Sequence, residues 1–82
     1  MLNFSEDEIL EFQDLISNNI RQLRIERNMT QLDLSIELGL KNSSYISHVE
    51  NPKIKTHHYS IVHLYKLSKI FDIDIEEFFK QK

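Results

Sequence analysis

The feature that most constrains the fold of this chain is the segment at residues 30–42, which contains its only glycine, Gly39. Apolar residues recur at spacings of three and four on both sides of that glycine, as they do in amphipathic helices. The segment therefore predicts a short helix, a turn, and the entry to a second helix. With one glycine, one proline and no long alternating pattern in 82 residues, little room remains for a sheet, and the predicted fold class is all-α.

The first helix is expected from about Glu6 to Glu26. Ser5 and Glu8 have the spacing of a capping box, in which each residue satisfies a free N–H of the other. We expect any bend in this helix at the polar residues 17–19. Its apolar side chains recur every three or four residues and are Ile9, Phe12, Ile16, Ile20 and Leu23.

The second helix should begin after Thr30, a favourable N-cap residue, with Asp33 completing a capping box. Leu34 and Leu38 are expected to face inward. Gly39 should end this helix, because glycine accepts the positive φ that commonly closes a helix. The turn that follows is about one residue longer than is usual between two such helices.

The third helix is expected to start at Asn42 or Ser43, either of which can act as its N-cap. Pro52 disfavours helical geometry at Asn51, so this helix should end there. Its inward-facing residues are predicted to be Ile46 and Val49.

After a polar loop at residues 53–58, two further helices complete the predicted set of five. The fourth spans about twelve residues and is marked by Ile61, Leu64, Leu67, Ser68 and Phe71. The fifth is short, is expected to be capped by Asp74 with Glu77, and carries Ile75, Phe78 and Phe79. We interpret residues 1–82 as a single domain, because a chain of this length builds one small core.

Composition excludes several classes of protein. The chain has no cysteine, no apolar run of about 18 residues and no signal peptide pattern, so we expect no disulfides, no membrane contact and a cytoplasmic location. The four histidines do not have the spacing of metal ligands, and no nucleophile, base and acid suggest a catalytic site. We therefore expect no enzyme activity, metal, cofactor or small-molecule ligand.

Charge is distributed unevenly along the chain, whose net charge is −3. Residues 1–16 carry five acids and no base, and residues 72–82 carry four acids against two bases. Residues 17–71 carry eight bases against four acids, which gives +4. A basic centre is compatible with a surface that faces nucleic acid.

Four segments, in this order, resemble the phage-repressor and Cro type of helix-turn-helix domain, often called Xre-like. They are Ile20-x-x-Leu23-Arg24, Thr30-Gln31-x-x-Leu34, Tyr45-Ile46-Ser47-x-Val49-Glu50, and Leu64-x-x-Leu67-Ser68-Lys69-x-Phe71 continuing to Phe79. The resemblance implies a five-helix, lambda-repressor-like fold, with the helix-turn-helix at residues 30–51. It also implies a regulator of transcription that binds double-stranded DNA with its third helix in the major groove.

The resemblance assigns roles to particular residues. Gln31 is expected to meet a phosphate at the start of the second helix, where free N–H groups favour anions. Ser44 and His48 lie one turn apart, so both can contact base edges. Tyr45 is expected either to contact DNA or to pack over the end of the second helix. The full set of candidate DNA contacts is Gln31, Asn42, Ser43, Ser44, Tyr45, Ser47, His48, Asn51, Lys53 and Lys55.

The resemblance also implies that Arg24 and Glu50 pair, and we expect this pair to be structural rather than DNA-binding. Pro52 departs from the family pattern, where glycine is common, and the loop to the fourth helix is about three residues longer. Among relatives, small domains of this kind include phage repressors and the controller proteins of restriction–modification systems.

Terminal apolar residues suggest that the chain binds another protein surface. Leu2, Phe4, Phe78 and Phe79 are either core residues or part of a dimer interface. We expect a homodimer that binds an inverted repeat, because a two-fold dimer presents two recognition helices to successive major grooves. The alternative is a protein-interaction module, such as an antitoxin that binds a partner protein.

Overall fold

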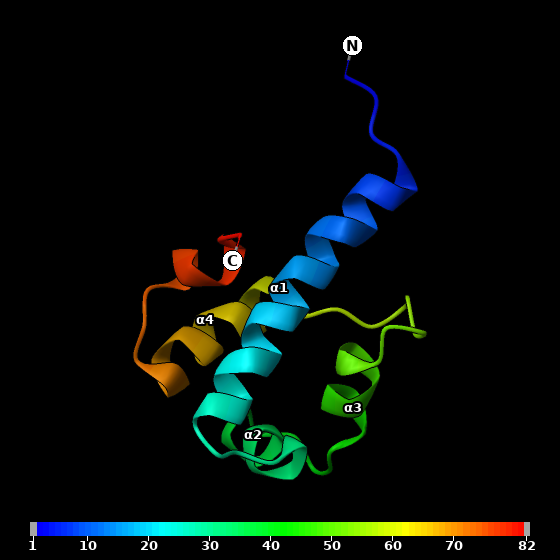
Figure 1. Ribbon diagram of the computed structural model, residues 1–82. Helices are drawn as coiled ribbons and strands as arrows, with labels where there is room; N and C mark the ends of the chain where they lie inside the picture. Colours follow the sequence, from blue (N-terminus) through cyan, green and yellow to red (C-terminus); the bar gives the residue numbers. More distant parts are fainter. Residues whose placement is uncertain (1, 82) are drawn as a thin grey trace.

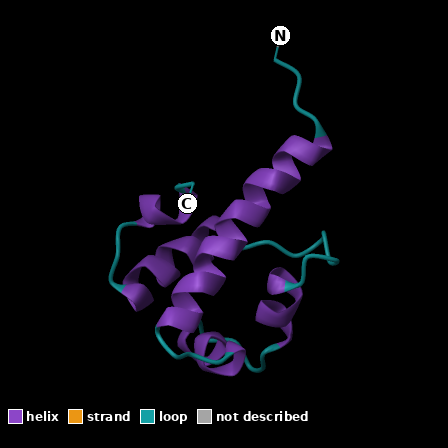
Figure 2. Cartoon of the chain, viewed as in Figure 1, coloured by secondary structure: helices purple, strands orange, loops and turns teal. Residues whose placement is uncertain are grey.

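The computed structural model describes residues 2–81, and within that range it contains four α-helices, one 3-10 helix and no strand (Figures 1 and 2). The α-helices are α1 (Glu6–Glu26), α2 (Gln31–Glu37), α3 (Ser44–Glu50) and α4 (Ile61–Phe71), and η1 is the 3-10 helix Ile75–Phe79. The predicted all-α class is confirmed. In the described range, no helix has the length and apolar character needed to cross a membrane.

One apolar core holds all five elements together. The inward-facing predictions for Leu34, Leu38, Ile46 and Val49 are confirmed, since all four side chains are buried. The side chains that form the core cluster come from every element and are Ile16, Ile20, Leu34, Leu38, Ile46, Leu64, Leu67, Phe71 and Phe78. Two small residues, Ser35 of α2 and Ser68 of α4, are also buried, and their size lets neighbouring helices pack closely.

Helix α1 runs unbroken from Glu6 to Glu26, so the polar residues 17–19 do not interrupt it. Its C-terminal half packs in the core, whereas its N-terminal half projects beyond the other helices (Figure 1). Ile9 and Phe12 therefore stay 47% and 53% exposed. The predicted apolar stripe of α1 thus extends past the core at these two residues, because the rest of the domain is shorter than the helix.

Most helix ends have the capping residues and backbone geometry that the sequence predicts. Thr30 and Asp33 form the predicted capping box, with N–H to oxygen distances of 3.0 and 2.8 Å, and Gly39 has φ +82°. At α3, however, the N-cap residue Ser43 makes no side-chain cap. The Oδ1 atom of Asn42 instead accepts from the Ser44 N–H at 2.9 Å, so the residue before the N-cap satisfies the helix start.

The C-terminal segment differs from the prediction. Residues 75–79 form a 3-10 helix, and Asp74 makes no side-chain cap, so the expected α-helix with an Asp74–Glu77 capping box is wrong. Phe78 is fully buried against Phe71, which places it in the core and not in an interface. Phe78 anchors this five-residue 3-10 helix to the core, and 3-10 helices are usually this short.

A buried amide fastens this segment to α1. Asn19 is 5% exposed, and its Nδ2 group donates to the carbonyl oxygens of Phe78 and Lys80 at 2.9 Å each. Both bonds join residues about sixty positions apart in the sequence. Asn19 therefore satisfies two C-terminal carbonyls that the short 3-10 helix leaves free.

Replacing Asn19 with Ala should lower the free energy of unfolding by about 2 kcal/mol, because two carbonyls lose their donor in a buried site. Asn18→Ala is the matched control, since Asn18 is exposed on the same helix, and it should change stability by less than about 0.5 kcal/mol. Urea denaturation measures both. Equal effects of the two substitutions would contradict the role given to Asn19.

Candidate nucleic-acid interface

Helices α2 and α3 pack against each other across the turn that contains Gly39 (Figure 1). Leu34 of α2 and Leu38, the residue just after α2, meet Ile46 of α3 in the core. Ser35 is fully buried on the inner side of α2, and its hydroxyl donates back to the Gln31 carbonyl at 2.8 Å. The pair thus has the arrangement of a helix-turn-helix, with a buried inner face and an outer face left open.

The outer face of α3 carries short polar side chains. Ser44 and Ser47 are exposed and His48 is half-buried, while Ile46 and Val49 point inward. The structure thus places three of the predicted contact residues, Ser44, Ser47 and His48, on one helix that the core holds from behind. Short side chains let a helix approach a groove closely, and their hydroxyl and imidazole groups can hydrogen-bond to base edges.

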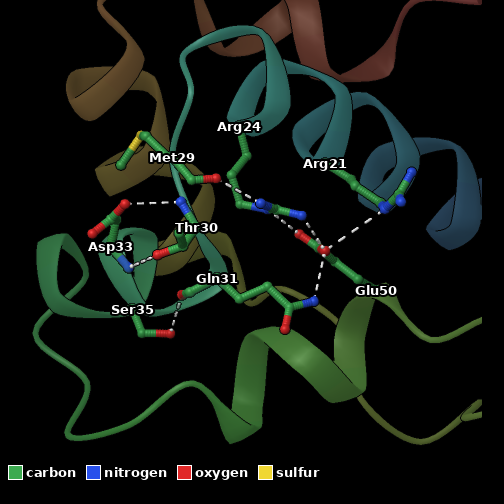
Figure 3. Close-up of polar contacts among 8 residues, drawn as sticks. All are labelled: Arg21, Arg24, Met29, Thr30, Gln31, Asp33, Ser35 and Glu50. Atoms are coloured by element: carbon green, nitrogen blue, oxygen red, sulfur yellow. Dashed lines mark hydrogen bonds and ion pairs between the residues drawn. The ribbon is translucent and has the colours of Figure 1, made fainter.

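The Glu50 carboxylate, at the end of α3, joins three parts of the domain (Figure 3). Arg24 donates two hydrogen bonds to this carboxylate, from Nε to Oε2 at 2.8 Å and from Nη2 to Oε1 at 2.9 Å. The same guanidinium donates from Nη1 to the Met29 carbonyl at 2.6 Å. These bonds raise the pKa of Arg24 above its ordinary value, chiefly through Glu50. The implied Arg24–Glu50 pair is thus present, between α1 and α3.

Gln31 is part of this network. Its Nε2 group donates to Glu50 Oε1 at 3.0 Å, which ties the first residue of α2 to the last residue of α3 (Figure 3). The side chain predicted to meet a phosphate thus makes a hydrogen bond within the domain, between the two helices. The pattern of the sequence gave no sign of this bond. Its backbone N–H remains at the start of α2, where helix N–H groups lack partners within the helix.

Arg21 is a contact that sequence reasoning missed. Its Nε lies 3.7 Å from Glu50 Oε1, and its side chain is 50% exposed, whereas that of Glu50 is 3% exposed. Arg21 precedes Arg24 by three residues, so both lie on one face of α1, and this spacing is the signal that would have identified it. The long distance and the exposure make Arg21 the weaker partner of Glu50.

Tyr45 turns away from the outer face of α3 and packs against the segment before α4. Its ring contacts those of His57, Tyr59 and His63 at centroid distances of 5.1–6.2 Å, and its hydroxyl donates to the His58 carbonyl. This packing differs from the expected position over the end of α2. The ring of His48 lies 4.8 Å from that of His57, which limits the rotation of His48. Aromatic packing thus connects α3 to the loop behind it.

The loop after α3 carries three candidate DNA contacts, Asn51 and two lysines, and the lysines lie in different environments. The Asn51 Oδ1 atom accepts from the Lys53 N–H at 3.0 Å, which shapes the turn, and Lys53 is exposed. The Lys55 ammonium instead lies 3.6 Å from Asp14 on α1, so it faces the first helix. Lys53 is thus the better placed of the two for a partner near α3.

A capping box that the sequence analysis did not predict begins α4. The Ser60 hydroxyl accepts from the His63 N–H at 3.1 Å, and His63 Nδ1 accepts from the Ser60 N–H at 3.4 Å. Histidine at this position replaces the usual glutamate or glutamine, which is why the pattern was not recognised. Burial, and then the nearby Lys66 charge, lower the pKa of His63 below its ordinary value.

Comparison with known proteins adds one match. Residues 18–82 match a family model described as a helix-turn-helix domain. No curated protein and no solved structure matches the chain. The matched residues include α2, α3 and the Arg24–Glu50 pair, and they begin within α1.

Arg24→Ala should lower the free energy of unfolding by about 3–5 kcal/mol, because it leaves the enclosed Glu50 carboxylate without its main partner. Arg21→Ala is the matched control and should cost less than about 1 kcal/mol, since that contact is long and half-exposed. Chemical denaturation with both variants measures the difference. A variant at Arg24 that melts like the unaltered protein would refute the structural role.

The lowered pKa of His63 predicts a loss of stability in mild acid. The unfolded chain takes up a proton at this residue at a higher pH than the folded chain does, so stability falls as pH drops below about 6.5. His63→Gln keeps the capping-box pattern and removes the titration, so its melting temperature should fall less between pH 7.5 and 5.5. An equal fall in both proteins would assign the pH dependence to other groups.

Proposed function

The chain belongs to a helix-turn-helix family of DNA-binding regulators, and from that premise we propose that it binds a specific double-stranded operator with α3 in the major groove. The observation that carries this proposal is the polar outer face of α3, held from behind by the core and at its end by Glu50. The sequence preference would then depend on the side chains that this face presents to the bases.

Base contacts are assigned to the exposed face of α3 and its entry. Ser44, Ser47 and His48 project from the helix, and Asn42 and Ser43 lie just before it. A serine hydroxyl rotates and can donate or accept, so it suits several bases, whereas the two nitrogens of imidazole lie in fixed directions on a rigid ring. His48, which packs against His57, is therefore the side chain that we expect to contribute most to sequence preference.

Phosphate contacts are assigned to residues on both sides of α3. Gln31 presents its backbone N–H at the start of α2, and Asn51 and Lys53 follow α3. Lys55 can join them only by leaving Asp14. Tyr45 packs against the segment before α4, and its hydroxyl donates to the His58 carbonyl, so we assign it no phosphate contact. The assigned groups neutralise or hydrogen-bond phosphates, so they supply affinity that depends on salt and not on sequence.

A homodimer on an inverted repeat completes the proposal. Two copies related by a two-fold axis would place their α3 helices about 34–36 Å apart, one turn of DNA. We further propose that the protein represses its own operon, so that occupancy of the operator follows its own concentration.

Selection of bound DNA from a random pool tests this proposal, followed by binding assays with two variants. His48→Ala should relax the preference at one base position, with a loss of about 1–3 kcal/mol for the selected sequence. Lys53→Ala should weaken binding to all sequences alike and lower the salt slope by about one. Lys69→Ala, which removes an exposed lysine of α4, is the matched control and should leave both quantities unchanged.

If no DNA is enriched at low salt, the proposal fails, and the protein-interaction alternative becomes the better explanation of the exposed apolar residues. Equal losses of DNA affinity in Lys53→Ala and Lys69→Ala would show that a positive charge supports binding wherever it lies. That result would contradict the proposed orientation of α3 on DNA.

A further inference from the structure

The first three turns of α1, with the extended residues before them, form a projecting arm (residues 2–15) that lies outside the family match (Figure 1). We propose that this arm is a self-association surface, on which the arm of a second copy packs antiparallel about a two-fold axis. The inference deepens the homodimer of the proposed function by assigning its interface.

The apolar residues of the arm continue the face that α1 buries in its own core. Ile9 and Phe12 precede Ile16 and Ile20 at helical spacing, so all four lie on one side of α1. Phe12 stacks on Phe79 with ring centroids 6.0 Å apart, which extends the face across η1. Together with Leu2 and Phe4, which is 69% exposed, this surface offers on the order of 500 Å² of apolar area, near the upper end for a monomer.

A groove lies beside this face, where the partner's arm could enter. Glu6, Ile9, Leu10 and Gln13 of α1 form one wall, and Lys55 and His58 of the following loop form the other. The residues that precede α1 extend beyond its first turn, away from the other helices (Figure 1). An antiparallel second arm would bring the partner's Phe4 to this groove and receive this copy's Phe4 in return.

Charge complementarity favours a second copy as the occupant. The arm carries five acids and no base, and Glu6 and Glu8 flank its apolar stripe, while Asp7, Glu11 and Asp14 lie on the opposite face. The far wall of the groove carries Lys55 and His58. The antiparallel arrangement sets the acidic first turn of each arm beside the other copy's Lys55, whose half-exposed ammonium also lies 3.6 Å from its own Asp14. Two copies would bury about 1,000 Å² in total, the lower bound for a specific interface.

Sedimentation velocity without DNA, over a concentration series, tests the proposal. The unaltered protein should form dimers, and Phe4→Ser with Ile9→Ser should raise the dimer dissociation constant at least about tenfold. The melting temperature should stay unchanged at concentrations where the unaltered protein is monomeric. Ile61→Ser is the matched control, because Ile61 is 80% exposed near the start of α4, and it should leave the constant unchanged.

Phe4 lies outside every helix and outside the core, so the single variant Phe4→Ser should fold even if the double variant is unstable. This single substitution should also raise the dimer dissociation constant. A monomer at the highest concentration, an unchanged constant in the arm variants, or dissociation caused only by Ile61→Ser would each overturn the proposal. A dimer that depends on the arm but enriches no DNA would leave this inference intact and remove the proposed function.

Discussion

The enclosed Glu50 carboxylate is the interaction on which the geometry of this domain most depends. It receives the Arg24 fork from α1 and the Gln31 amide from α2, and it stands at the end of α3. Three helices thus converge on one charge whose side chain is 3% exposed. An enclosed ion pair adds little net stability when compared with an apolar core, but it allows few alternative arrangements. In this domain it fixes how α3 is presented.

The second constraint is the division of α3 into two faces. Ile46 and Val49 hold the helix on the core, and Ser44, Ser47 and His48 remain outside. The aromatic contacts of Tyr45 and His48 with the following loop restrict α3 further. A helix held at its end, its inner face and its flank can present short side chains in a constant orientation, and such preorganisation favours specific binding.

Patterns local to the chain predicted most of the fold. The Thr30 and Asp33 cap, the positive φ of Gly39 and the buried leucines of α2 follow from short-range rules, and the structure confirms them. The contacts that the sequence did not reveal connect distant residues. Gln31 with Glu50, Asn19 with the C-terminal carbonyls, and Tyr45 with His58 depend on how the helices pack. The 3-10 geometry of η1 and the burial of Phe78 likewise depend on tertiary packing, and the spacing of the apolar residues does not predict them.

Perturbation of backbone amide signals by operator DNA, followed by NMR on labelled protein, tests the central claim most directly. The account predicts that the largest changes fall in α3, at the start of α2 and at Asn51 and Lys53, and that α4 and η1 change little. If the largest changes instead fall on α4 or along the outer side of α1, the assignment of α3 as the DNA-contacting helix would be contradicted.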